Sequence, residues 1–238
     1  MADPTTTALD ADVLVAAGHR LTRTVDALEP DDWHAPSLLP GWTRSHVVAH
    51  LALNGEALGG VLRGVVDGET VPMYPSQQRR DDDIEELAAA ERSNLRDRLL
   101  ASLTTFVEAA RAVPEHAWSG RFDRTTDGPS LPLDAIPLMR LRELEIHHAD
   151  LGAGYTSADW STAFAEHVIS SMSRRLDPDQ GFRVAPLDAS RTWDVGEIGE
   201  DSRVVTGPVT DVAWWLTGRE PSDQVSCSRG ALPMIGGW

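Results

Sequence analysis

Apolar residues recur every three or four positions through residues 9–28, with polar residues between them. This spacing places the apolar side chains on one face and predicts an amphipathic helix. Glu29 and Pro30 end the pattern. The apolar positions of this first predicted helix are Val13, Leu14, Ala17, Leu21, Val25 and Leu28.

Two more helical patterns follow. The second predicted helix begins after Thr43, a good N-cap residue, and runs to about Val66 before residues 67–68 break it. The third is predicted to begin with three aspartates, residues 81–83, because the helix dipole favours acidic side chains in a first turn. Its apolar stripe continues until Pro114 stops it.

A fourth helix is predicted from about residue 133 to residue 150, after a loop over residues 115–130 that has room for one short strand. The glycine-rich residues 152–154 then close the helical unit. Four amphipathic helices predict a four-helix bundle. We therefore assign residues 1–155 to a helical domain.

Residues 156–238 have a different pattern, in which short β-type runs occur between helices. The chain is thus predicted to be an α+β protein, with a helical bundle followed by a small C-terminal α+β domain. The elements expected in the second domain are helices at 157–175 and 209–216 and strands at 182–185, 191–195 and 203–206.

The amino-acid composition limits the kinds of partner and the cellular compartment that we expect for this protein. The 238 residues carry a formal net charge of −16, which argues against nucleic acid and anionic membranes because both need clustered positive charge. The N-terminal residues lack a basic segment, and no apolar run is long enough to span a bilayer. A single cysteine, Cys227, excludes an internal disulfide. A cytoplasmic protein is expected, for which a monomer is plausible.

All 21 basic residues are arginine. Without lysine the chain has no Schiff-base residue, no pyridoxal linkage and no P-loop lysine. Cys227 has no basic motif near it in the sequence to lower its pKa, so it is a poor nucleophile candidate. A buried or incidental thiol is the expected state of Cys227.

Metal-capable side chains occur four residues apart in two predicted helices: His46 and His50 in the second, Glu143 and His147 in the fourth. Residues four apart share a helix face, so each pair is able to contribute ligands to one ion. Two histidines and a carboxylate suit zinc and leave a fourth position open, as catalytic zinc sites do. The same spacing has an alternative interpretation without a metal, in which both helix faces are simply polar surfaces turned to solvent. Spacing does not choose between His46 and His50, or between the second pair and its neighbours Glu145, His148 and Asp150.

Arginines and one tyrosine complete the candidate chemistry. Arg140 and Arg142 flank the second pair, and Arg80 and Arg219 lie at loop or helix-end positions. Most arginines are solvated surface groups, but a guanidinium near a metal matches a carboxylate substrate. Tyr74, which lies among prolines, is either a loop anchor or a site-lining group, and we favour the anchor.

Three segments together resemble a known family. Residues 39–50 read LPGWTRSHVVAH, residues 72–74 read PMY, and residues 139–151 read MRLRELEIHHADL. In this order they closely resemble the mycothiol-dependent maleylpyruvate isomerases, which belong to the wider group of DinB-like metal-dependent four-helix bundles. The resemblance spans nearly the whole chain and implies a DinB-like bundle with a small C-terminal domain.

The resemblance also implies a ligand set. Carried over position by position, it assigns His50, Glu143 and His147 as zinc ligands and leaves His46 out. The chain departs from the family pattern at Glu145, where such sequences often have an aromatic residue.

The implied reaction converts maleylpyruvate to fumarylpyruvate, a cis-to-trans isomerisation in aromatic breakdown through gentisate. It requires zinc and mycothiol, whose sulfur is expected to add to the double bond, allow rotation and leave again. Arg80 and Arg219 are implied to face the dicarboxylic keto acid or the thiol.

Three alternatives to this function stay open. A mycothiol S-transferase would use the same thiol and metal and leave the thiol attached to its product. A zinc hydrolase needs a positioned general base, for which Glu145 and Asp150 are the uncertain candidates. A non-catalytic module would bind an apolar ligand or partner through its small C-terminal domain.

Overall fold

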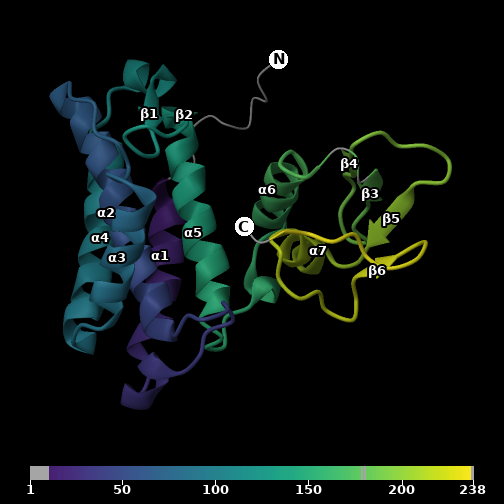
Figure 1. Cartoon of the computed structure of the whole chain (residues 1–238), viewed down its shortest axis with the longest axis horizontal. Coiled ribbons are helices and arrows are strands. Elements are labelled where there is room, and N and C mark those ends of the chain that lie inside the picture. The colour runs from purple at the N-terminus through teal and green to yellow at the C-terminus, as the bar shows by residue number, and fades with distance from the viewer. Residues whose placement is uncertain (1–10, 178, 180, 237–238) are drawn as a thin grey trace. The chain divides into compact units, whose positions relative to one another are not determined.

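The computed structural model describes residues 11–177, 179 and 181–236. The chain divides into two compact units, the first ending at Gly154 and the second beginning at Tyr155. Figure 1 draws the helical first unit in purple to teal and the second, with its small sheet, in green to yellow. Helices followed by small sheets make this an α+β fold, as predicted.

The contacts among four helices of the first unit close a ring. Helices α1 (Ala11–Asp26) and α2 (Arg44–Asp67) each contact both α4 (Arg92–Ala112) and α5 (Ile136–Asp150). Helix α3 (Gln77–Ala88) packs against α2 outside this ring. The predicted four-helix bundle is therefore present, with one additional helix.

The ends of α2 follow the local sequence signals. Thr43 caps its N-terminus through a capping box with His46, and Gly68 ends it with a left-handed φ of 75°. Only glycine adopts that conformation without a steric penalty, which explains why the helix stops there. The predicted bounds of this helix are confirmed.

The single helix predicted from residue 81 to Pro114 is wrong. The structure has two helices, α3 and α4, separated at residues 89–91, and α3 begins at Gln77 with Ser76 as its cap. Asp81–Asp83 therefore lie inside α3 and not in a first turn. Joined, α3 and α4 would extend about 54 Å, whereas α2 is about 36 Å long at 1.5 Å per residue. The break lets both helices contact α2.

A short hairpin precedes α5, where the sequence predicted room for one strand. Strands β1 (Arg121–Asp123) and β2 (Ser130–Pro132) pair in antiparallel register. The loop before α3 is attached to the same region, because the amides of Met73 and Tyr74 donate to the carbonyls of Asp123 and Arg124 at 2.9 and 3.0 Å. This fixes the Tyr74 loop to the bundle.

The second unit contains a mixed four-stranded sheet and two α-helices that pack against each other. The helix predicted at Ser157 begins instead as the 3-10 turn η5 (Ser157–Asp159), and the α-helix proper starts after Ser161. Strands β3, β4 and β5 and the second helix lie close to where the sequence predicted them, whereas strand β6 was not predicted. The bounds are α6 Thr162–Ser173, β3 Phe182–Val184, β4 Trp193–Val195, β5 Arg203–Thr206, α7 Val209–Leu216 and β6 Ser226–Cys227. The strand order in the sheet is β4-β3-β5-β6.

Each unit has its own apolar core. In the part of the chain that the structure describes, no helix is both long and apolar enough to cross a membrane. The bundle core includes Leu21, Leu51, Leu58, Leu62, Leu95, Leu99, Phe106 and Ile146, and that of the second unit includes Val168, Ile169, Phe182, Val184, Val205 and Val212.

Candidate metal centre

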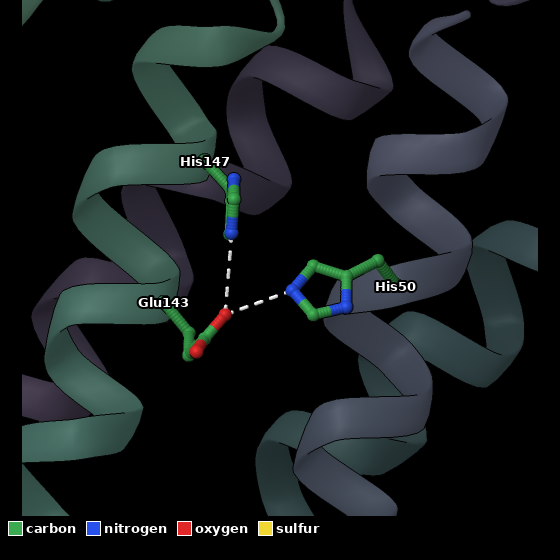
Figure 2. Close-up of side chains that lie close together, drawn as sticks. All are labelled: His50, Glu143 and His147. Atoms are coloured by element: carbon green, nitrogen blue, oxygen red, sulfur yellow. Dashed lines mark hydrogen bonds and ion pairs between the residues drawn. The ribbon is translucent and has the colours of Figure 1, made fainter. Parts of the chain in front are cut away.

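Three of the predicted side chains meet inside the bundle. Figure 2 shows His50 on α2 facing Glu143 and His147 on α5. The carboxylate oxygen Oε2 of Glu143 lies 2.8 Å from Nε2 of His50 and 3.3 Å from Nε2 of His147. One nitrogen or oxygen atom from each residue falls within 4.8 Å of the others. The two histidines are buried, and Glu143 is partly exposed.

The environment sets different protonation preferences for these three groups. Burial lowers the pKa of His50 to about 4, although Glu143 acts in the opposite direction. Burial opposes the charge on Glu143, but hydrogen bonds from His147 and His50 outweigh it and hold its pKa well below the usual range. Burial likewise opposes protonation of His147, yet its bonds to Asp150 and Glu143 raise its pKa. Glu143 is thus ionised and His50 neutral near pH 7.

Each histidine has a second partner on its other ring nitrogen. Nδ1 of His147 lies 2.8 Å from a carboxylate oxygen of the fully buried Asp150. A carboxylate only accepts, so Nδ1 carries the proton and Nε2 is directed at Glu143. Nδ1 of His50 instead lies 3.2 Å from a nitrogen of Arg80, a group that only donates. Nε2 of His50 therefore carries the proton that Glu143 accepts.

The donor set fits a zinc ion. Ligand atoms about 2.0–2.1 Å from a tetrahedral ion lie about 3.3 Å from one another. The separation between His147 and Glu143 already has this value, and that between His50 and Glu143 has to widen by about 0.5 Å. Asp150 supplies the carboxylate partner that usually orients a metal-binding histidine.

The other residues that the sequence offered as metal ligands contact different groups. His46 accepts from the backbone amide of Thr43 in the capping box, and its other nitrogen lies 3.2 Å from Glu85. Glu145 forms an ion pair with Arg20 on α1. His148, the remaining competitor, lies 2.7 Å from the hydroxyl of Thr24, also on α1.

Arg80 and Arg219 lie in different units. Arg80 follows the Tyr74 loop on α3 and contacts both His50 and the Tyr74 ring, whose centroid is 5.8 Å from the guanidinium carbon. Arg219 belongs to the second unit, where it packs over Trp214 and donates to the carbonyl of Thr217 at 2.7 Å. The structure therefore brings Arg80 to the three residues.

The sequence analysis missed Asn54 as a candidate, and it did not predict that Arg140 is buried. Arg140 is fully buried and donates to the backbone of Leu51 and to the side chain of Asn54, both at 2.8 Å. Asn54 also lowers the pKa of the Tyr74 hydroxyl, against the larger opposite effect of burial. The signal in the sequence is spacing, because Asn54 lies one helical turn after His50. Tyr74 is thus both an anchor of its loop and a neighbour of the site.

Fold and site together define a class. A four-helix bundle that gathers two histidines and one glutamate from two of its helices is a DinB-like bundle with a candidate metal centre.

Comparison with known proteins gives the particular family. Residues 14–152, more than half of the chain, match the family described as the mycothiol maleylpyruvate isomerase N-terminal domain. The chain belongs to this family. No curated protein matches it.

Two solved structures are similar over nearly the full length. One is a crystal structure of the mycothiol-dependent maleylpyruvate isomerase, and the other is a variant of that protein with one histidine replaced by alanine. Each has 28% sequence identity and a TM-score of 0.84, with 96% of this chain and 95% of the other covered. The likeness therefore includes the small C-terminal unit.

Proposed function

We propose that this protein is a zinc- and mycothiol-dependent isomerase that converts maleylpyruvate to fumarylpyruvate in aromatic breakdown. The observation that carries the proposal is the group formed by His50, Glu143 and His147 in a chain of this family. The full-length similarity to the crystallised isomerase supports the same activity.

The three residues would hold the metal through Nε2 of each histidine and a carboxylate oxygen of Glu143. Zinc, when bound, acts as a Lewis acid that lowers the pKa of a thiol beside it. Asp150 keeps a proton on Nδ1 of His147, so Nε2 is the nitrogen that would bind a cation once its own proton, now shared with Glu143, is released. Burial keeps His50 neutral, which leaves no charge on the ring to repel a cation.

Arginines are suited to hold a carboxylate of the substrate. Arg80 is next to His50, and its guanidinium, which also pairs with Asp81, would bind a carboxylate by exchanging these partners. Arg219, in the C-terminal unit, is proposed to face the substrate or the thiol. A held carboxylate would keep the substrate in place while its central bond rotates.

An external thiol agrees with what the chain itself offers. Cys227, the single cysteine, lies at the β6 strand and donates to the carbonyl of Arg229 at 3.3 Å. Mycothiol would supply the sulfur that adds to the double bond and leaves after rotation. Glu145 is paired with Arg20 and Asp150 with His147, so neither is placed as the general base that a zinc hydrolase needs.

The test combines metal content with product analysis. His50→Ala and His147→Ala should lose zinc and activity together, whereas His46→Ala should keep both because His46 faces Thr43 and Glu85. Fumarylpyruvate should form with mycothiol regenerated. If mycothiol stayed attached to the product, the protein would be an S-transferase and not an isomerase. Full activity in a zinc-free variant would reject the metal site.

A further inference from the structure

Arg140 is a buried cation near the start of α5. It is 1% exposed, and burial lowers its pKa to about 10, so the guanidinium still carries its charge at neutral pH. One of its terminal nitrogens, Nη2, has no hydrogen-bond partner among the residues that the structure describes. Burying a charge costs free energy unless its contacts compensate for the loss of water. An incompletely paired guanidinium in the core therefore calls for an explanation.

The other terminal nitrogen of Arg140, Nη1, connects α5 to α2. It donates to the backbone carbonyl of Leu51 and to the side-chain oxygen of Asn54, both at 2.8 Å. Leu51 follows His50 directly, and Asn54 lies one helical turn after His50. On its own helix, Arg140 lies one turn before Glu143. The guanidinium thus attaches the turn of α2 that contains His50 to the turn of α5 that contains Glu143.

The space for this contact exists because residue 55 is glycine. A Cβ atom at Gly55 would lie 2.6 Å from Nη2 of Arg140, which is closer than a side-chain carbon is able to approach. A larger residue would have to displace the guanidinium. On the α4 side, the ring centroid of Phe106 lies 5.9 Å from the guanidinium carbon. Arg140 is therefore held in one position between three helices.

The proposed metal ligands come from two helices, as Figure 2 shows. Glu143 and His147 share one face of α5, so the helix itself keeps them together. His50 is on α2, and its distance from the other two depends on how α2 lies against α5. Hydrogen bonds to two acceptors on α2 fix both the separation and the register of the two helices, because each bond has a preferred length and direction.

A second arginine joins the same two helices at a different level. Arg44, the first residue of α2, donates to the carbonyls of Leu151 and Gly152 beyond the end of α5 at 2.9 and 3.0 Å. It lies six residues before His50, whereas Arg140 contacts the residue next to His50. Arg44 is therefore a matched comparison, with the same residue type and the same pair of helices but without a contact at the His50 turn.

We propose that Arg140 is a positioning residue of the metal centre, which holds the His50 turn of α2 where His50, Glu143 and His147 are able to share one ion; this rests on the metal site of the proposed function. In this role Arg140 touches neither the ion nor the substrate and acts through α2. The charge strengthens its two hydrogen bonds, since bonds from a charged donor are stronger than neutral ones.

Arg140→Met separates this role from a general contribution to stability. Replacing a buried ion by an apolar side chain of similar size often leaves stability unchanged, so the metal-free variant should unfold within about 5 °C of the wild type. Its affinity for Co²⁺ should nevertheless fall about 10- to 100-fold. Cobalt alone is the probe, because its visible absorption changes with the geometry of its ligands. Wild-type affinity and an unchanged cobalt spectrum in Arg140→Met would overturn the proposal.

Arg44→Met is the matched control. It removes the bonds to Leu151 and Gly152 and an ion pair with Asp32 at 2.8 Å, and it should change cobalt affinity little. If Arg44→Met weakened cobalt binding as much as Arg140→Met, any loosening of α2 from α5 would have the same effect. The specific role of Arg140 would then be rejected.

Gly55→Ala displaces the guanidinium without changing Arg140 itself. It should also weaken cobalt binding, and the double variant with Arg140→Met should lose no more affinity than Arg140→Met alone. Gly60→Ala, on the same helix, is the control, because the nearest neighbour of its Cβ would be 3.9 Å away. Independent, multiplicative losses in the double variant would contradict the proposal.

Failure of the proposed function gives a different result from failure of this inference. A wild-type protein that binds no cobalt would reject the metal site and, with it, the role of Arg140. Cobalt binding without isomerisation of maleylpyruvate by the zinc-loaded protein would reject the isomerase and keep the positioning role. Isomerisation together with unchanged cobalt binding in Arg140→Met would reject the role of Arg140 alone.

Discussion

Asp150 orients His147, a role that sequence spacing could not assign. In the sequence, Asp150, Glu145 and His148 were equivalent competitors, because all lie within one turn of His147. The structure separates them by face: Asp150 contacts His147, whereas Glu145 and His148 contact α1. Which carboxylate faces which helix depends on how α5 packs, and that information is absent from local spacing.

Asp150→Asn should weaken zinc binding about 10- to 100-fold, because the amide presents a poorer acceptor to Nδ1 of His147. The matched control on the same helix is Glu145→Gln. It breaks the ion pair with Arg20 and should cost about 1–2 kcal/mol of unfolding free energy with zinc affinity unchanged. Competition with a fluorescent chelator measures the affinity, and urea unfolding measures the stability. Equal zinc affinities in Asp150→Asn and Glu145→Gln would contradict the assignment.

Arg80 should change partners when zinc is loaded. A cation on Nε2 of His50 leaves the ring proton on Nδ1, where it would face the N–H of Arg80. We expect the guanidinium to move away from Nδ1 while remaining available to Tyr74 and to a substrate carboxylate. A crystal structure of the zinc-loaded protein measures this separation. Retention of the 3.2 Å contact with zinc on Nε2 would contradict the expected change.

At the scale of elements, the sequence predicted α2 best because its ends have strong local signals in Thr43 and Gly68. It failed between α3 and α4, where residues 89–91 are Ala-Ala-Glu and contain neither glycine nor proline. These residue types favour a helix, so the break arises from packing of both helices on α2. Tertiary contacts decided what local propensity could not.

Close packing of α2 on α5 predicts opposite effects of two glycine substitutions. A Cβ at Gly55 would lie 2.6 Å from a nitrogen of Arg140, so Gly55→Ala should destabilise the fold by about 1–3 kcal/mol by displacing that buried side chain. At Gly60, on the same helix, the nearest neighbour would be 3.9 Å away. Gly60→Ala should stabilise by about 0.5–1 kcal/mol through helix propensity. Thermal unfolding measures both, and a neutral Gly55→Ala would contradict this packing.

At the scale of the whole molecule, the residues to which we assign a function lie in both units. The bundle contains His50, Glu143 and His147, whereas Arg219 belongs to the unit that begins at Tyr155. The order of helical and β-type patterns was enough to predict the α+β class. The choice of His50 over His46 came from family resemblance; in the structure His50 lies beside Glu143 and His147, whereas His46 contacts Thr43.

A fragment of residues 1–154 should therefore bind zinc but not isomerise maleylpyruvate. All three proposed ligands are present in it, and Arg219, which is proposed to face the substrate or the thiol, is not. Circular dichroism checks that the fragment is helical, and metal analysis gives its zinc content. A helical fragment without zinc would contradict placement of the metal site within the bundle.

The central claim is that one zinc ion and mycothiol together make this protein an isomerase. Zinc titration of the metal-free protein, with isomerisation of maleylpyruvate followed in the same samples, tests it most directly. Activity should rise in proportion to bound zinc, reach its limit at about one zinc per chain through His50, Glu143 and His147, and be absent without mycothiol. Undiminished turnover in the zinc-free protein, or turnover without mycothiol, would contradict the claim.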